Sequence, residues 1–191
     1  MRYRSALYRI LGRQDEAIEL YKQVVSLDPL RARSYSSLAG QLYFAGRYDE
    51  ALAMLQRALE LNPQKEGDHH IWGLILLAQG HPQQALTEVE REPREIWKLF
   101  GRALAYQALG RSQDSVTALN QLVIKHHQDS AYQIAEVYAY RGETDKAFEW
   151  LLRAYQQRDG GMLSVKADPL LRSLHHDPRY ADMLRKMRLP T

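Results

Sequence analysis

The chain has 191 residues, 45% of them apolar and 26% charged, which excludes a disordered chain because enough apolar surface is present to offset the entropy of ordering. It contains no cysteine, which excludes disulfide scaffolds, thiolate metal sites and cysteine nucleophiles and fits a reducing compartment, so we expect a cytoplasmic protein. The net charge of +3 is only a weak indication of nucleic-acid binding, and we do not expect nucleic acid as a partner. The longest apolar run, residues 71–78, is too short to cross a membrane.

Glycines recur along the chain at a nearly constant spacing. Gly12, Gly46, Gly80, Gly110 and Gly142 lie 34, 34, 30 and 32 residues apart. Each is followed five positions later by a small residue, and these residues are Ala17, Ala51, Ala85, Ser115 and Ala147. A period of this length indicates stacked helical hairpins that share one continuous core.

The segments around each glycine predict two helices. In residues 31–64, Tyr35, Leu38 and Leu42 are spaced to lie on one face of a first helix. Gly46 then ends that helix in a left-handed conformation, which other residues resist. Asp49 follows at the expected start of the second helix, where a carboxylate faces the positive end of the helix dipole.

Three departures from the pattern carry structural expectations. The second helix of the third hairpin meets Pro93 early, with Glu92 at a position where a small packing residue is expected, so we predict a short helix and a local change in superhelix pitch. Arg102 takes the place of a leucine in the fourth hairpin. The last hairpin is interrupted at residues 160–161, which are both glycine.

Beyond the last hairpin we expect a loop over residues 160–168 and then two short helices. Asp168 and Asp177 are predicted helix caps, each followed by proline at the first helical position. The apolar stripes of these helices predict a cover for the exposed edge of the last hairpin. The first hairpin has no such cover, so we expect either a preceding part of a longer protein or a second copy of the chain to shield it, which would make a homo-oligomer.

These residues resemble the tetratricopeptide repeat family. The second repeat carries the motif most fully, with Tyr35, Leu38, Ala39, Leu42, Gly46, Ala51, Leu55, Ala58 and Pro63. The resemblance implies an all-α fold in which about five hairpins form a right-handed superhelical solenoid. The repeats cover about 1–30, 31–64, 65–94, 95–126 and 127–158 of an array over 1–158, and residues 159–191 form a loop and two C-terminal capping helices.

The family resemblance also implies a non-catalytic scaffold or adaptor that binds a protein or peptide. The tail, with its two Asp-Pro pairs, resembles C-terminal segments of bacterial multidomain proteins that carry such arrays. The alternative function is therefore a regulatory or sensory segment of a protein that carries a cyclase, a kinase or a winged-helix DNA-binding domain.

The sequence offers no pattern for catalysis. The seven histidines include the pairs at 69–70, 126–127 and 175–176, but neighbours on a helix point about 100° apart and do not form a chelate. There is no metalloprotease motif, phosphate-binding loop or nucleophile elbow. We therefore expect no enzyme activity, no cofactor and no metal.

In the family, the first helices of the hairpins line a concave groove that holds an extended peptide or a partner helix. Carried onto this sequence, the groove positions are Arg33, Ser36, Ser37, Gly40, Tyr43, Phe44, His70, Leu74, Leu77, Trp97, Phe100, Leu104, Gln107, Tyr132, Gln133, Glu136 and Tyr140. The alternative is that several of them pack against neighbouring helices. Members that clamp a C-terminal carboxylate use lysine and asparagine where this chain has Ser36, Gly40, His70 and Leu74, so we do not expect that ligand.

Overall fold

The computed structural model describes residues 7–190, and this part of the chain is helical without any β-strand. Residues 7–10 are helical and lead into the turn at Gly12. The elements that follow are α2 (Gln14–Leu27), α3 (Ala32–Phe44), α4 (Tyr48–Leu61), α5 (Asp68–Ala78), α6 (Pro82–Glu90), α7 (Glu95–Ala108), α8 (Ser112–His126), α9 (Ala131–Tyr140), α10 (Thr144–Gln157), η1 (Gly160–Ser164), η2 (Pro169–Leu174) and α11 (Pro178–Lys186). The predicted all-α solenoid of helical hairpins is confirmed.

The turn glycines have the conformation that their spacing predicted. Their φ angles are 75°, 73°, 79°, 73° and 76° in chain order, all in the left-handed region. At Gly46, the N–H of the glycine donates to the carbonyl of Tyr43, and the N–H of Arg47 donates to Leu42 over 2.8 Å. These bonds satisfy the last free carbonyls of α3 and reverse the chain into α4.

The small residue five positions after each glycine lies where the two helices of a hairpin meet. All five of these residues have an exposed fraction of 0%. Ser115, the one polar member, donates its hydroxyl to the carbonyl of Ala103 on the facing helix over 2.7 Å. A larger side chain would push the helices apart, because protein interiors have no spare volume at such contacts.

The third hairpin is short, as predicted from Pro93. α6 has 9 residues, whereas α4 and α10 have 14 each. Glu92 is completely buried, and its carboxylate accepts hydrogen bonds from the N–H groups of Gly67 and His70 at 3.0 to 3.2 Å. The side chain therefore caps the N-terminus of α5, which explains a charged residue at a packing position.

Arg102, which replaces the usual leucine, also has a partner in the third hairpin. Its guanidinium forms two hydrogen bonds of 2.6 Å with the carboxylate of Glu90. The pair ties α7 to the end of α6 across the junction of two hairpins.

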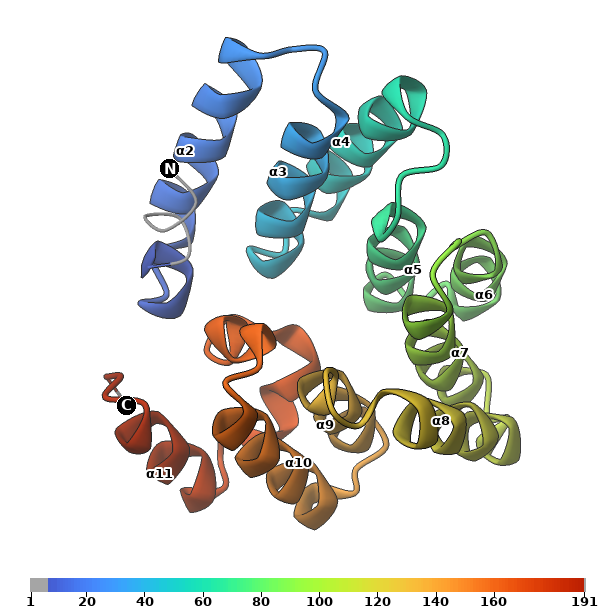
Figure 1. Ribbon diagram of the computed structural model, residues 1–191, viewed down its shortest axis with the longest axis vertical. Helices are drawn as coiled ribbons and strands as arrows, with labels where there is room; N and C mark the ends of the chain where they lie inside the picture. The colour runs from blue at the N-terminus through green and yellow to red at the C-terminus, as the bar shows by residue number, and fades with distance from the viewer. Residues whose placement is uncertain (1–6, 191) are drawn as a thin grey trace.

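The helices follow a strongly curved path, with the first helix of each hairpin on the inside, and α2 and α11 lie on the same side of the molecule (Figure 1). The segment that follows α10 turns back toward the inside of this curve. Residues 160–168 were predicted as a loop, and this is wrong in part, since Gly160–Ser164 form the 3₁₀-helix η1. Asp159 explains the helical turn, because its side chain accepts the N–H of Gly161 over 2.9 Å.

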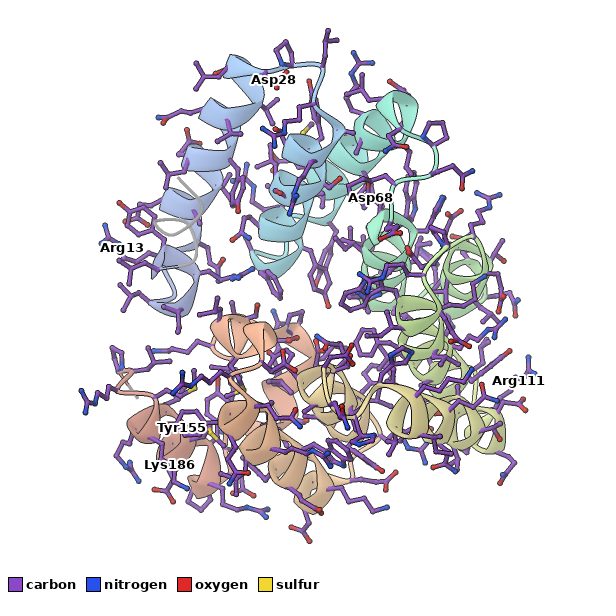
Figure 2. All side chains as sticks on the ribbon, viewed as in Figure 1. Arg13, Asp28, Asp68, Arg111, Tyr155 and Lys186 are labelled. Carbon is purple, nitrogen blue, oxygen red and sulfur yellow. The ribbon has the colours of Figure 1, made fainter. Side chains whose placement is uncertain are left out.

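The first of the two predicted capping helices is a 3₁₀-helix, η2, and the second is the α-helix α11. The two aspartate caps are confirmed: Asp168 accepts the N–H of Leu170, and Asp177 accepts that of Arg179, each over 2.9 Å. Figure 2 shows α11 beside α10, where the hydroxyl of Tyr155 donates to the carbonyl of Lys186 over 3.2 Å.

The cover predicted for the last hairpin is present in the structure. Side chains of η2 and α11 join those of α9 and α10 in one buried cluster. Its largest contributors from the covering segment are Met162, Leu171, Leu174, Tyr180, Met183 and Leu184. The segment after α10 therefore covers the apolar side of the last hairpin.

Candidate functional site: the concave face

Two adjoining hollows lie on the concave face. The first, which we call the aromatic hollow, has a volume of about 310 Å³ and is lined by Gly40, Tyr43, Phe44, Glu66, Gly67, His70, Ile71, Leu74, Trp97, Phe100, Tyr132, Gln133, Glu136, Gly161, Ser164 and Asp168. The second, which we call the polar hollow, has a volume of about 320 Å³ and is lined by Arg9, Tyr21, Arg33, Ser36, Ser37, Gly40, Gln41, Phe44, Lys65, Glu66, Gly67, Asp68 and Ile71. Gly40 and Phe44 of α3 belong to both, so the hollows form one continuous surface.

Rings from four inner helices, α3, α5, α7 and α9, gather in the aromatic hollow. The imidazole of His70 stacks on Trp97 with 4.7 Å between ring centroids, and it lies 5.2 Å from Phe100. Tyr43 and Phe44 form a second pair at 5.4 Å. Burial lowers the pKa of His70 to about 3, so the imidazole is neutral at physiological pH, and its Nδ1 has no hydrogen-bond partner.

Two buried carboxyl groups meet on the opposite wall of the same hollow. Glu136 comes from α9, and Asp168 precedes η2 in the C-terminal segment. The hydroxyl of Tyr132 donates to Asp168 Oδ2 over 2.7 Å, whereas Oε2 of Glu136 has no partner. Burial raises the pKa of both carboxyl groups, and the charge of Asp168 raises that of Glu136 further.

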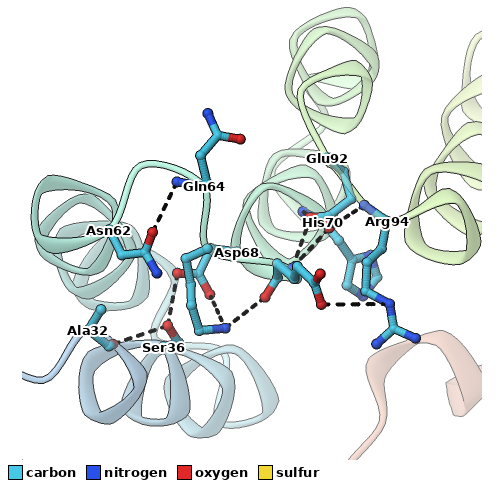
Figure 3. Close-up of polar contacts among 11 residues, drawn as sticks. Ala32, Ser36, Asn62, Gln64, Asp68, His70, Glu92 and Arg94 are labelled. Carbon is cyan, nitrogen blue, oxygen red and sulfur yellow. Dashed lines mark hydrogen bonds and ion pairs between the residues drawn. The ribbon is translucent and has the colours of Figure 1, made fainter.

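The polar hollow is held together by hydrogen bonds where α5 begins beside α3. The hydroxyl of Ser36 donates to Oδ2 of Asp68 over 2.8 Å, and Nζ of Lys65 lies 3.9 Å from the same carboxylate (Figure 3). Burial raises the pKa of Asp68 to about 6. Arg9 borders this hollow, with its guanidinium 5.5 Å from the ring centroid of Phe44.

The predicted groove residues divide into three groups. Those lining the aromatic hollow are Gly40, Tyr43, Phe44, His70, Leu74, Trp97, Phe100, Tyr132, Gln133 and Glu136. Those lining the polar hollow are Arg33, Ser36, Ser37, Gly40 and Phe44. Leu77, Leu104, Gln107 and Tyr140 line neither hollow.

Some predicted groove residues serve the packing of the helices. Leu104 is completely buried, Phe100 is 1% exposed and Tyr132 is 2% exposed. Gln107 accepts a hydrogen bond of 3.0 Å from Arg141 of the next hairpin. Their role in binding a partner stays a prediction, and these contacts favour Phe44 and Trp97, which are only half-buried, as the residues that a partner would reach.

Sequence reasoning missed the contribution of the C-terminal segment to this face. Gly161, Ser164 and Asp168 line the aromatic hollow together with α3, although Asp168 was expected only to cap a helix. The signal was absent because these residues lie more than 110 positions from α3 in the sequence. Glu66 and Gly67, in the turn before α5, were missed because the groove prediction was limited to the first helices.

Within residues 7–190, no three histidine, aspartate or glutamate side chains are grouped so that they could hold a metal ion. Among the helices described, none combines the length and the apolar character needed to cross a bilayer.

Comparisons with known families agree with the repeat pattern. The family model described as anaphase-promoting complex, cyclosome, subunit 3 matches residues 11–92. A model described as tetratricopeptide repeat matches residues 100–161. No curated protein sequence gives a significant match to this chain.

Solved structures with the same fold are similar over most of this chain. A thermophilic tetratricopeptide repeat protein of Thermus thermophilus is 20% identical, with 95% of each chain covered and a TM-score of 0.65. A tetratricopeptide repeat protein of Parabacteroides merdae is 16% identical, covering 96% of this chain and 75% of that one, with a TM-score of 0.59. MamA is 19% identical, covering 79% of this chain and 92% of that one, with a TM-score of 0.53. At these identities the likeness concerns the fold.

Proposed function

Since the chain belongs to the tetratricopeptide repeat family, we propose that it is a non-catalytic interaction module that holds a segment of a protein partner against its concave face. The family is in general a protein-interaction fold, and this is the starting point of the proposal. We further propose that this segment lies in the two hollows, because of the side chains that line them.

The observation that carries the proposal is the composition of the aromatic hollow. Trp97 and Phe44 present half-buried rings on a concave surface, where a partner can bury large apolar area at little cost in conformational entropy. Unpaired polar atoms of His70 and Glu136 lie in the same hollow and could orient a bound segment.

Peptides selected from a displayed random library on the wild-type protein test this proposal. We expect the selected peptides to lose binding to a Phe44→Ala, Trp97→Ala double variant. The matched control is an Ile124→Ala, Leu152→Ala double variant, since these side chains are 75% and 37% exposed and line neither hollow. Equal binding to both double variants, with folding verified by circular dichroism, would reject the concave face as the site.

A second copy of the chain is the partner that we propose for the first hairpin. Leu27 and Leu30 are each 74% exposed there, and Leu7 is 53% exposed. Such side chains are a common component of subunit contacts when they gather at one place. Sedimentation at rising concentration, with and without substitution of these leucines, measures this association.

The alternative function also remains a proposal. The C-terminal segment with Asp168 and Asp177 is the feature that resembles regulatory segments of bacterial multidomain proteins, and the lack of cysteine favours a cytoplasmic setting. The genomic neighbourhood and full reading frame would show whether a cyclase, kinase or DNA-binding domain is joined to this chain.

A further inference from the structure

We propose that the aromatic hollow takes a positively charged side chain, lysine or arginine, of the bound partner segment. This inference rests on the proposed function, because it names the chemistry of the residue that anchors the segment at the same face. It is argued from the charge of the walls, the unpaired atoms and the rings of the hollow.

The walls of the aromatic hollow are acidic. Glu136 and Asp168 lie on one side, and Glu66 lies at the rim, where its side chain is 61% exposed. None of the described residues that line this hollow is lysine or arginine. Arg94 lies beside this rim, with its Nε 3.8 Å from the carboxylate of Glu66. The hollow therefore has acidic groups whose ionised form a cation would favour and an anion would oppose.

One oxygen of Glu136 also lacks a hydrogen-bond donor. The residue is only 7% exposed, and Oε2 has no partner even though Glu136 borders an open hollow. Buried polar atoms are almost always paired, and a buried carboxylate oxygen without a donor is costly. An ammonium or guanidinium group entering the hollow would supply the missing donor and would favour the ionised form of the carboxyl.

The rings complete a site for a cation. Tyr43, Phe44 and Trp97 line the hollow, and a cation is attracted to the face of an aromatic ring within about 6 Å of its centroid. One such cation–ring contact already exists beside the hollow, because the guanidinium of Arg9 lies 5.5 Å from the ring centroid of Phe44. Arg9 lines the polar hollow and acts on Asp168 from there, but it is not among the residues that line the aromatic hollow, which leaves room there for a cation from a partner.

A purely structural role for Glu136 predicts a different result from a binding role. Burial and the neighbouring Asp168 oppose ionisation of Glu136, so a neutral glutamine of the same shape should stabilise the unliganded fold. If Glu136 receives a cation, the same substitution should weaken binding. A rise in stability together with a loss of affinity distinguishes the binding role from a structural one.

Binding of a cation should also release a proton, because it favours the ionised form of the carboxyl pair. The groups that act on this pair are Arg9, Tyr43, Tyr132, Asp159, His175 and Tyr180. Arg9 and His175 favour ionisation of Asp168, whereas Asp159 opposes that of Glu136 and burial opposes both. We therefore expect the affinity for a cation to increase as the pH rises, because a higher pH favours the ionised form of the pair.

Small probes test the inference without any knowledge of the partner. Nα-acetyl-lysine methylamide, its arginine counterpart and the uncharged norleucine counterpart are titrated into the wild-type protein, with the indole N–H of Trp97 followed by NMR. We expect both charged probes to shift this resonance and the norleucine probe to bind about 10-fold more weakly, the effect of about 1.4 kcal/mol. The arginine and lysine arms show which cation is preferred.

The same titration on variants locates the site. Glu136→Gln should weaken binding of the preferred charged probe about 10-fold. Glu66→Gln, which changes only the exposed rim and leaves the fold intact, should weaken it about twofold. Glu149→Gln on α10, exposed and outside both hollows, is the matched control and should leave the affinity unchanged.

Several outcomes would overturn the inference. Norleucine binding as tightly as lysine and arginine would exclude charge as the cause, and unchanged affinity in both Glu136→Gln and Glu66→Gln would place the cation elsewhere. Displayed peptides that need Phe44 and Trp97 but tolerate loss of every basic residue would reject the inference and leave the proposed function standing. Peptides indifferent to Phe44 and Trp97 would instead reject the proposed function itself.

Discussion

Apolar side chains are buried at one end of the solenoid and exposed at the other. At the C-terminal end, Leu171 and Leu174 are completely buried against the last hairpin. At the N-terminal end, Leu27 and Leu30 are each 74% exposed. Both ends are built from the same kind of hairpin, so the difference comes from what packs on each one.

The C-terminal cover is held by polar anchors as well as by apolar contacts. Asp159 accepts the N–H of Tyr132 over 3.0 Å and so joins the start of η1 to α9. The hydroxyl of Tyr132 donates to Asp168, and that of Tyr180 donates to the carbonyl of Val165 over 2.9 Å. Short 3₁₀ turns have little helical periodicity to direct their packing, and these buried hydrogen bonds fix their position.

The largest effect that we expect comes from opening the C-terminal cover. Leu171→Ala removes a completely buried side chain and should lower the free energy of unfolding by about 2–5 kcal/mol, through lost burial and the cavity left behind. Urea unfolding measures this change. Leu27→Ala, at the exposed end, is the control, and a cost as small as that of the control would show that η2 does not stabilise the last hairpin.

A smaller effect is expected from the close contact of η1 with α9. A Cβ atom added at Gly161 would lie 2.4 Å from the ring of Tyr132, whereas one added at Gly160 would meet nothing within 4 Å. Gly161→Ala should therefore displace the segment and cost about 1–3 kcal/mol, with faster hydrogen exchange over residues 160–174. Gly160→Ala is the matched control, and equal exchange in the two variants would contradict the packing of η1 on Tyr132.

The repeat pattern was sufficient to predict the hairpins, because each turn depends on residues close in sequence. Gly46 predicted a left-handed turn and Ala51 a close helix contact, and both depend only on local chain geometry. The short α6 followed from Pro93 in the same way. Aspartate caps at 168 and 177 were also predictable, since a cap bonds to a residue two positions away.

The candidate site could be predicted only in part, because its walls come from distant segments. The first helices indicated Trp97 and Glu136, but the contact of Asp168 with the same hollow depends on the curvature of the whole array. The capping role of Glu92 was not predicted for a similar reason, since its partners lie 22 and 25 positions earlier in the chain. Pairing over such separations leaves no periodic signal in a single sequence.

The buried carboxyl pair should make the stability of the covered end depend on pH. The pKa of Glu136 is raised in the folded state by burial and by Asp168, so the folded protein retains a proton that the unfolded chain releases. Stability from this group is therefore present at low pH and is lost as the pH rises from the unfolded pKa of about 4.3. Asp68, with a pKa of about 6, contributes in the same direction from the other half of the molecule.

Glu136→Gln isolates the contribution of Glu136 to this profile. The variant should be more stable than the wild type at pH 8, by about 1–3 kcal/mol, and the difference should shrink toward pH 4. Thermal melts of both proteins between pH 4 and pH 8 measure this difference in stability. Asp68 contributes equally to the two proteins, so its contribution cancels when they are compared. A constant difference at all pH values would show that packing, not ionisation, distinguishes the two side chains.

The smallest effect on folding is expected at the uncovered end, from a Leu27→Ser, Leu30→Ser double variant. Both side chains are mostly solvent-exposed, so each change should alter the free energy of unfolding by less than about 0.5 kcal/mol. If a second copy covers this edge, as we propose, sedimentation at high concentration should show association in the wild type and loss of it in the variant. A stable monomer in both cases would refute self-association, and a large loss of stability would mean that these leucines are buried by contacts within the chain.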